Sequence, residues 1–210
     1  MQGDRAIRCS CGSLRGVARA VSGSRGNRVV CHCDDCQSFA HFLGRANEIL
    51  DAQGGTEIFQ MSPARLEILT GADRLACMRL TPTGLVRWYA ECCGTPIGNT
   101  LITQQVPFVG LILACVEPGA AAGSRDAVLG PVRVHVQIRF AKGDRAQLHG
   151  RDRGTLTVML RFAAMILWAC LRGEQKASPF FDPKTGQTRA IPRVLSEPEL
   201  REVERRRDAA

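Results

Sequence analysis

The stretch CHCDDC, residues 31 to 36, places three cysteines within six positions. Cys9 and Cys11 precede it as Cys-x-Cys, and Cys92 and Cys93 follow as an adjacent pair. Thiolates are soft anionic ligands that suit Zn²⁺, and a short spacing lets one turn present two sulfurs to the same ion. The clustered thiols therefore predict one or two zinc ions per chain.

Together the clusters could supply one site with four ligands and one with three. Cys31, Cys33 and Cys36 would form the smaller site. A closed four-cysteine site is structural, whereas three protein ligands leave a position for water or substrate. His32 is a further candidate ligand, but a residue between two cysteines in an extended segment points away from their sulfurs. We therefore expect chemistry at an open CHCDDC site.

Three further cysteines and the N-terminus are expected to play no part in metal binding or secretion. Cys77, Cys115 and Cys170 each stand alone in an apolar run, where free cysteine is ordinarily a small core residue. The N-terminus has no apolar leader, so we expect no secretory signal, a cytoplasmic location and no disulfide framework. The net charge of +8 is compatible with nucleic acid, acidic membranes or small anions and does not distinguish them.

The elements that position the cysteines are predicted to be short strands. Residues 1 to 44 have the glycines and cysteines of hairpins and tight turns. Apolar runs bounded by turn residues predict further strands at 65–69, 75–80, 85–90, 107–116 and 133–140. The predicted fold class is therefore mainly β.

After residue 141 the sequence predicts helices and an extended segment in place of short strands. Residues 155–172 predict a helix that Gly173 ends, and the proline-rich residues 178–192 predict an extended segment. Ser196 opens a capping box and a short charged helix. We expect a β zinc-binding domain at 1–141 with a C-terminal extension at 142–210 packed on it.

The predicted helix at 155–172 is apolar on nearly all sides. It is shorter than the roughly 20 residues that span a bilayer, and Arg161 interrupts it, so we expect no membrane span. An apolar surface of this size is usually buried. We expect it to lie across the β core or at an interface between copies of the chain.

Three motifs in order, CSCG (9–12), CHCDDCQ (31–37) and WYAECCGTPIGNT (88–100), resemble the glutathione-dependent formaldehyde-activating enzyme (GFA) family, also called centromere-protein-V-like. The resemblance covers residues 5 to about 115. It implies a tent-like arrangement of β-sheets around two zinc sites. It also implies reversible carbon–sulfur chemistry that joins glutathione and formaldehyde.

By this resemblance, the CSCG cysteines belong to a structural zinc and the CHCDDC cysteines hold a catalytic one. The family completes its structural site with Cys-x-x-Cys-Gly. Here Cys93 precedes Gly94, but the position three residues before Cys93 is Ala90. Neighbouring residues in a strand face opposite sides, so Cys92 can substitute only if the chain turns sharply. Otherwise the site has three ligands or is empty.

The function we expect is that of a carbon–sulfur lyase acting on an adduct of a thiol, such as glutathione, with a small carbonyl compound. Zinc would lower the pKa of the substrate thiol and hold it as thiolate. Asp34 and Asp35 could carry protons, although exposed turn residues are the commoner role. Arg79, Arg87 and Lys142 could meet the carboxylates of glutathione, but scattered basic residues are ordinarily plain surface.

The alternative is a non-catalytic module whose zinc is only structural and which contacts protein or nucleic acid. Four cysteines at both sites, or closure of the second by His32, would favour it. Arginines at 201 and 205–207 could contact phosphate, but glutamates alternate with them, as in a solvated salt-bridged helix. The sequence has no RNP-like aromatic motif or recognition-helix signature, so we expect no nucleic-acid partner.

Overall fold

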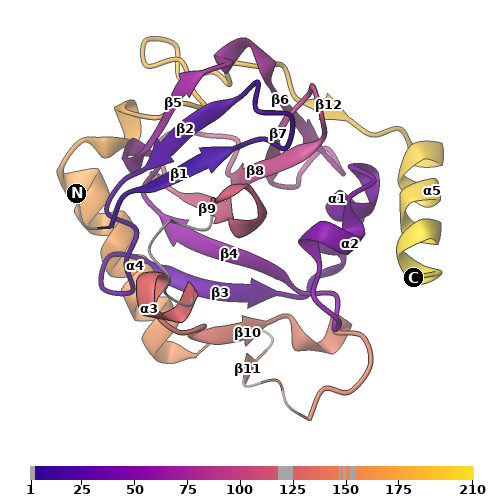
Figure 1. The fold of residues 1–210 in the computed structure, drawn as a ribbon. Coiled ribbons are helices and arrows are strands. Elements are labelled where there is room, and N and C mark those ends of the chain that lie inside the picture. Colours follow the sequence, from indigo (N-terminus) through magenta and orange to yellow (C-terminus); the bar gives the residue numbers. More distant parts are fainter. Residues whose placement is uncertain (1–2, 118–124, 147, 149, 152–154) are drawn as a thin grey trace.

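The computed structural model describes residues 3–117, 125–146, 148, 150–151 and 155–210. The strands are β1 Arg5–Arg8, β2 Arg15–Ala18, β3 Asn27–Cys31, β4 Thr56–Met61, β5 Leu66–Thr70, β6 Leu75–Arg79, β7 Val86–Ala90, β8 Thr95–Thr100, β9 Val109–Ile112, β10 Val134–Val136, β11 Gly150–Arg151 and β12 Arg193–Val194. Nine of them form a mixed sheet in the order β11-β10-β3-β4-β9-β8-β7-β6-β12, and β1, β2 and β5 form a second sheet. The prediction of a mainly β fold is confirmed (Figure 1).

The two sheets share the larger hydrophobic core. Apolar side chains of β1, β2 and β5 meet those of the nine-stranded sheet, with the fully buried Trp88 among them. Phe180 and Phe181, from the extended segment near the C-terminus, lie against Trp88 with ring centroids 4.8 and 6.3 Å away. The C-terminal extension thus supplies part of the core as well as the edge strand β12.

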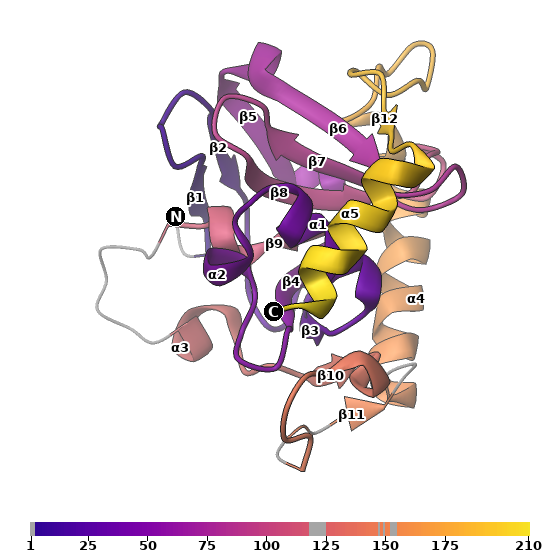
Figure 2. The same ribbon diagram turned by 90° about the vertical axis from the view of Figure 1, so that its right-hand side faces the viewer.

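The helices lie around the larger sheet (Figure 2). They are α1 Asp34–Phe42, α2 Ala46–Ile49, α3 Arg125–Leu129, α4 Leu156–Leu171 and α5 Glu197–Asp208, with short 3₁₀ turns at Pro63–Arg65, Ala72–Arg74, Leu113–Cys115, Ile138–Phe140 and Glu174–Lys176. Helices α1 and α5 pack together through Phe39, Ala40 and Val203. This contact ties the last helix to the helix that begins inside the CHCDDC motif.

Several predicted elements are present with small shifts. The strands predicted at 65–69, 75–80 and 85–90 are β5, β6 and β7, and the helix predicted at 155–172 is α4. At α5, the Ser196 backbone N–H donates to the Glu199 carboxylate at 2.9 Å, as a capping box requires.

Two strand predictions were too long, and the helices α1, α2 and α3 were not predicted. The strand predicted at 133–140 ends at Val136, because Gln137 adopts a φ of +58° and a 3₁₀ turn follows. The run at 107–116 is a strand only at Val109–Ile112. Residues 34–42, expected among hairpins and turns, form α1.

Helix α4 contacts the sheet through a narrow face. Only Val158 and Ala169 are buried among its residues. The exposed large apolar side chains on α4 are Leu156, Met159, Leu160, Leu167, Trp168 and Leu171. The helix was expected to lie across the β core, and only this narrow face does so. Self-association through the exposed side of α4 stays a prediction. Within the described residues, every helix is too short or too polar to cross a bilayer.

Candidate metal centres

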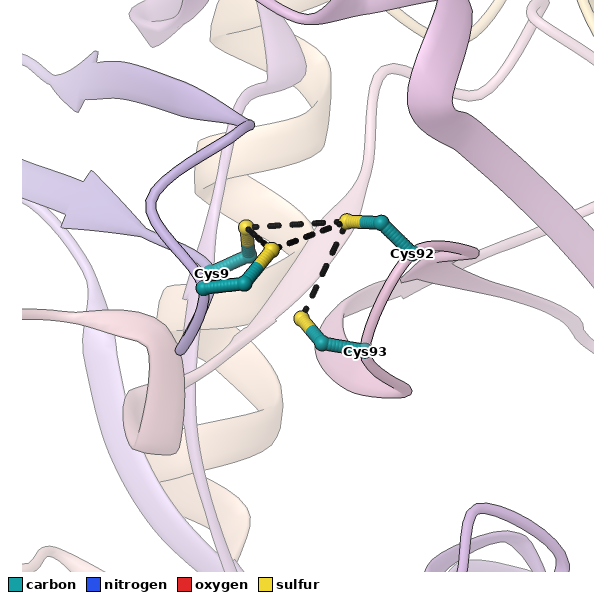
Figure 3. Close-up of side chains that lie close together, drawn as sticks. Cys9, Cys92 and Cys93 are labelled. Carbon is teal, nitrogen blue, oxygen red and sulfur yellow. Dashed lines mark hydrogen bonds between the residues drawn. The ribbon is translucent and has the colours of Figure 1, made fainter.

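The structure brings the two cysteines of the CSCG motif and the adjacent pair Cys92 and Cys93 into one group. All four Sγ atoms lie within 4.8 Å of one another. The Sγ–Sγ separations are 3.4 Å for Cys9–Cys11, 3.8 Å for Cys9–Cys92, 3.3 Å for Cys11–Cys92 and 3.9 Å for Cys92–Cys93. Figure 3 shows the sulfurs of Cys9, Cys92 and Cys93 turned toward one another from two separate turns. All four are free thiols, so the group is able to hold a metal ion.

A tight turn after β1 presents the first two sulfurs. The Gly12 N–H donates to the Cys9 carbonyl at 2.9 Å, and Gly12 has a φ of +78°, which glycine adopts without strain. The Leu14 N–H then donates to Cys9 Sγ at 3.2 Å. This turn places Cys9 in the core and Cys11 at the surface.

A second tight turn, between β7 and β8, presents the other two sulfurs. The N–H groups of Cys93 and Gly94 both donate to the Ala90 carbonyl, at 3.3 and 2.8 Å. Gly94 has a φ of +70° that closes the turn. This is the sharp turn that lets Cys92 and Cys93 lie on the same side of the chain. Both neighbouring cysteines therefore reach the same group.

The thiols of this group ionise unequally. Although burial opposes it, hydrogen bonds from Ser10 and Thr95 lower the pKa of Cys93 to about 5. Burial and hydrogen bonds with the other cysteines raise the pKa of Cys92 to about 12. Four thiolates so close together repel one another, so a cation is needed to hold them all in the ionised form.

The second group consists of Cys31, Cys33 and Cys36, whose Sγ atoms also lie within 4.8 Å of one another. Cys31 ends β3, Cys33 caps the N-terminus of α1, and Cys36 lies in the first helical turn. The Cys36 N–H donates to Cys33 Sγ at 3.4 Å, and the Sγ atoms of Cys31 and Cys33 are 3.4 Å apart. The positive end of the α1 dipole favours thiolates at this position.

Arg87, on β7, lies directly beside this second group. Its side chain is buried, with the residue only 1% exposed, and its Nη1 lies 3.9 Å from Cys36 Sγ. Its Nη2 pairs with the Asp35 carboxylate at 3.3 Å, and the guanidinium lies over the Phe39 ring, 5.4 Å from the centroid. The expectation that Arg87 is plain surface was therefore wrong. The available signal was a single arginine within the otherwise apolar run LVRWYA.

The three thiols cannot all ionise without a cation. Hydrogen bonds from Cys31 and Cys33, together with the charge of Arg87, hold the pKa of Cys36 well below its usual range. Hydrogen bonds with its two neighbours, and burial, raise the pKa of Cys31 well above its usual value. The hydrogen bond with Cys31 lowers the pKa of Cys33, but its interaction with Cys36 and burial outweigh this and raise it to about 12.

His32 lies outside the group of sulfurs. It is fully buried, with Nδ1 3.1 Å from the Gln53 carbonyl oxygen and Nε2 3.0 Å from Nδ1 of His135. The two imidazole rings stack with centroids 5.3 Å apart. Both ring nitrogens of His32 are thus engaged away from the cysteines.

Arg79 and Lys142 bond to groups outside both cysteine clusters, whereas Asp34 and Asp35 lie between Cys33 and Cys36. Arg79 donates to the Gly84 carbonyl at 3.2 Å, and Lys142 donates to the Arg207 carbonyl at 2.5 Å. Asp34 and Asp35 are partly exposed residues of the first turn of α1. The single cysteines are separate from both clusters, with Cys77 and Cys115 buried and Cys170 partly buried.

The chain belongs to a family of unknown function, DUF6151, whose model matches residues 2–190. A search of the curated proteins found no match.

Proposed function

We propose that this protein is a zinc-dependent enzyme of the carbon–sulfur lyase type that handles the adduct of a thiol with a small carbonyl compound. The observation that carries the proposal is the difference between the two cysteine groups. One offers four sulfurs to a metal ion, and the other offers three. Because His32 is engaged elsewhere, the second group leaves one coordination position for a ligand from outside.

The donor set and its spacing fit zinc. With Zn–S bonds of about 2.3 Å, a tetrahedral site has sulfurs roughly 3.8 Å apart. Four of the Sγ–Sγ separations in the first group, at 3.3 to 3.9 Å, and the 3.4 Å between Cys31 and Cys33 lie close to that spacing. Soft thiolate donors also favour zinc over hard cations such as Mg²⁺ or Ca²⁺.

In this proposal zinc, Arg87 and Asp35 each have a separate role at the three-cysteine group. Zinc bound there would supply a positive centre that lowers the pKa of a substrate thiol. Three thiolates and Zn²⁺ together carry a formal charge of −1, and the buried guanidinium of Arg87 offsets it. Asp35, with its side chain 56% exposed, lies between that guanidinium and solvent, where it could carry a proton.

The substrate class rests on the motifs. The ordered set CSCG, CHCDDCQ and CCGTP resembles the GFA family, whose chemistry joins glutathione and formaldehyde. Glutathione plus a formaldehyde-like carbonyl is accordingly the first substrate pair to test.

A second candidate function is a non-catalytic module with structural zinc only. The burial of Cys36, which is 6% exposed, favours it because a substrate must reach the metal through Cys31 and Cys33, which are only partly exposed. In this case the fourth position would be filled by water alone.

Zinc content and cobalt spectroscopy separate the two functions. Elemental analysis of freshly purified protein should give two zinc ions per chain, one fewer in Cys36→Ser, and no change in the control Cys170→Ser. In protein reloaded with Co²⁺, added glutathione should change the visible spectrum only if an open position accepts a thiol. Two metal ions with an unchanged spectrum would favour the structural module, and absence of zinc would overturn both functions.

A further inference from the structure

A groove of about 510 Å³ lies between one face of α4 and the turn before β3. Residues 24–27, Ser62 and Arg65 form one side. Residues of α4 from Arg161 to Ala169, with Arg172 just beyond the end of the helix, form the other. Its volume is within the usual range for sites that bind small organic molecules. Figure 2 shows α4 running alongside the larger sheet.

The groove collects positive charge. Four arginines line it, Arg25, Arg65, Arg161 and Arg172, and Glu174 is the one carboxylate among the lining residues. Arg172 and Glu174 are separated by 4.0 Å, at the limit of an ion pair. Among the described residues no carboxylate pairs with the other three arginines, so most of the positive charge remains uncompensated.

Neutral oxygens fix two of these guanidinium groups in place. Arg161 donates to Asn27 Oδ1 at 3.1 Å and to the Gly23 carbonyl at 2.9 Å. Arg65 donates to the Arg25 carbonyl at 2.6 Å. These bonds orient the groups without removing their charge. Burial, and next the charge of Arg25, lower the pKa of Arg65, which reports the same crowding of cations.

One buried hydroxyl in the groove has no partner. Ser62 is 3% exposed, and its Oγ makes no hydrogen bond within the described part of the chain. An unpartnered buried polar atom is costly. Ser62 lines the groove, so a hydrogen-bonding ligand bound there lies next to this residue.

The α4 side of the groove adds an aromatic surface. Trp168 is 58% exposed, and the Arg172 guanidinium lies over its indole with Cζ 4.9 Å from the ring centroid. Met165 lies on the same wall. A flat organic group could pack here while its anionic part meets the arginines.

We propose that this groove binds a small organic phosphate, with the phosphate held by Arg25 and Arg172 and the flat part of the ligand against Trp168. A phosphate offers several oxygens and up to two negative charges, which suits a groove lined by four arginines better than a single carboxylate does. The groove is separate from the three-cysteine group. Asn27 begins β3 and Cys31 ends it, about 13 Å away along an extended strand. The proposal therefore does not depend on the enzyme function above.

Calorimetric titration of the zinc-loaded protein tests this directly, with adenosine monophosphate, inorganic phosphate and adenosine as probes. We expect the monophosphate to bind more tightly than phosphate or adenosine. Arg25→Gln and Arg172→Gln should each weaken it about tenfold or more, since a hydrogen bond to a charged group is lost. Arg201→Gln, which removes an exposed arginine on α5, is the matched control and should leave binding unchanged.

Arg25 and Arg172 are largely exposed, so their substitution leaves the core intact. Weaker binding by these variants therefore reports a lost contact with the ligand and not unfolding. Equal weakening by Arg201→Gln would show unspecific charge attraction and overturn the proposal, as would adenosine binding as tightly as its monophosphate, or no binding at millimolar concentration. A short thymidine oligonucleotide distinguishes the source of the phosphate. Tighter binding of the oligonucleotide with a steep salt dependence would identify the groove as part of a nucleic-acid surface, and weaker binding would identify a free small molecule.

Discussion

The most informative single substitution is Arg87→Met, which removes a buried positive charge beside the three-cysteine group and keeps an unbranched apolar side chain. Arg87 Nη1 lies 3.9 Å from Cys36 Sγ, and Asn99 Oδ1 lies 3.4 Å from the same nitrogen. After the substitution the negative charge of the sulfurs would have no cation from the protein beside it. The protein should therefore lose stability in its metal-loaded form.

The distance sets the size of the effect. Two unit charges 3.9 Å apart interact by about 4 kcal/mol at an effective dielectric constant of about 20. Removing one partner of a buried charge pair typically costs about 3–5 kcal/mol. We expect a loss of about 3 kcal/mol in the free energy of unfolding. For a chain of this size the melting temperature should fall by about 6–12 °C.

Thermal denaturation followed by circular dichroism measures the change, with zinc content determined on the same samples. Asp35→Asn removes the exposed partner of Arg87 and should cost about 1 kcal/mol or less, because its side chain is 56% exposed. Arg201→Met, at the surface of α5, controls for the loss of one positive charge. If Arg87→Met destabilises the protein no more than Arg201→Met does, the guanidinium does not stabilise the sulfurs and this reasoning is refuted.

Two further predictions concern the helices. Burial, and then the charges of Lys142, Arg207 and Arg206, lower the pKa of His41 below 6.5, so the folded state binds fewer protons than the unfolded state and loses stability as the pH falls below about 6.5. Denaturant unfolding at pH 5 to 7 should therefore show a shallower rise of stability with pH in His41→Gln than in the wild type, and parallel curves would contradict this. If the exposed face of α4 joins two copies, Leu160→Lys should convert a dimer to a monomer in sedimentation velocity. The equally exposed control Leu69→Lys should leave the mass unchanged, and a monomeric wild type would end the dimer hypothesis.

The sequence indicated the ligands better than it indicated what lies around them. Cysteine spacing is local, so the CSCG and CHCDDC groups could be recognised directly, and strands such as β6 and β7 followed from short apolar runs between turns. The contact of Arg87 with Cys36 joins residues 51 positions apart, and no local pattern reports such a pairing. Helix α1 was missed because its first residues serve as ligand, cap and acidic first turn at once. Only the assembled fold shows that Cys33 caps this helix.

The two cysteine groups also differ in what a metal ion would do for the fold. Cys9 and Cys92 are 83 positions apart, and their turns belong to different sheets, so a metal ion there would cross-link the two sheets. Cys31 and Cys36 are five positions apart, and closing so short a loop removes little chain entropy. By the logarithmic dependence on loop length, the difference between the two closures is about 2.5 kcal/mol. Stabilisation therefore explains the four-cysteine group well and the three-cysteine group poorly. The smaller group lies at the N-terminus of α1 with a buried arginine beside it, and binding of an external ligand accounts for that arrangement better than cross-linking does.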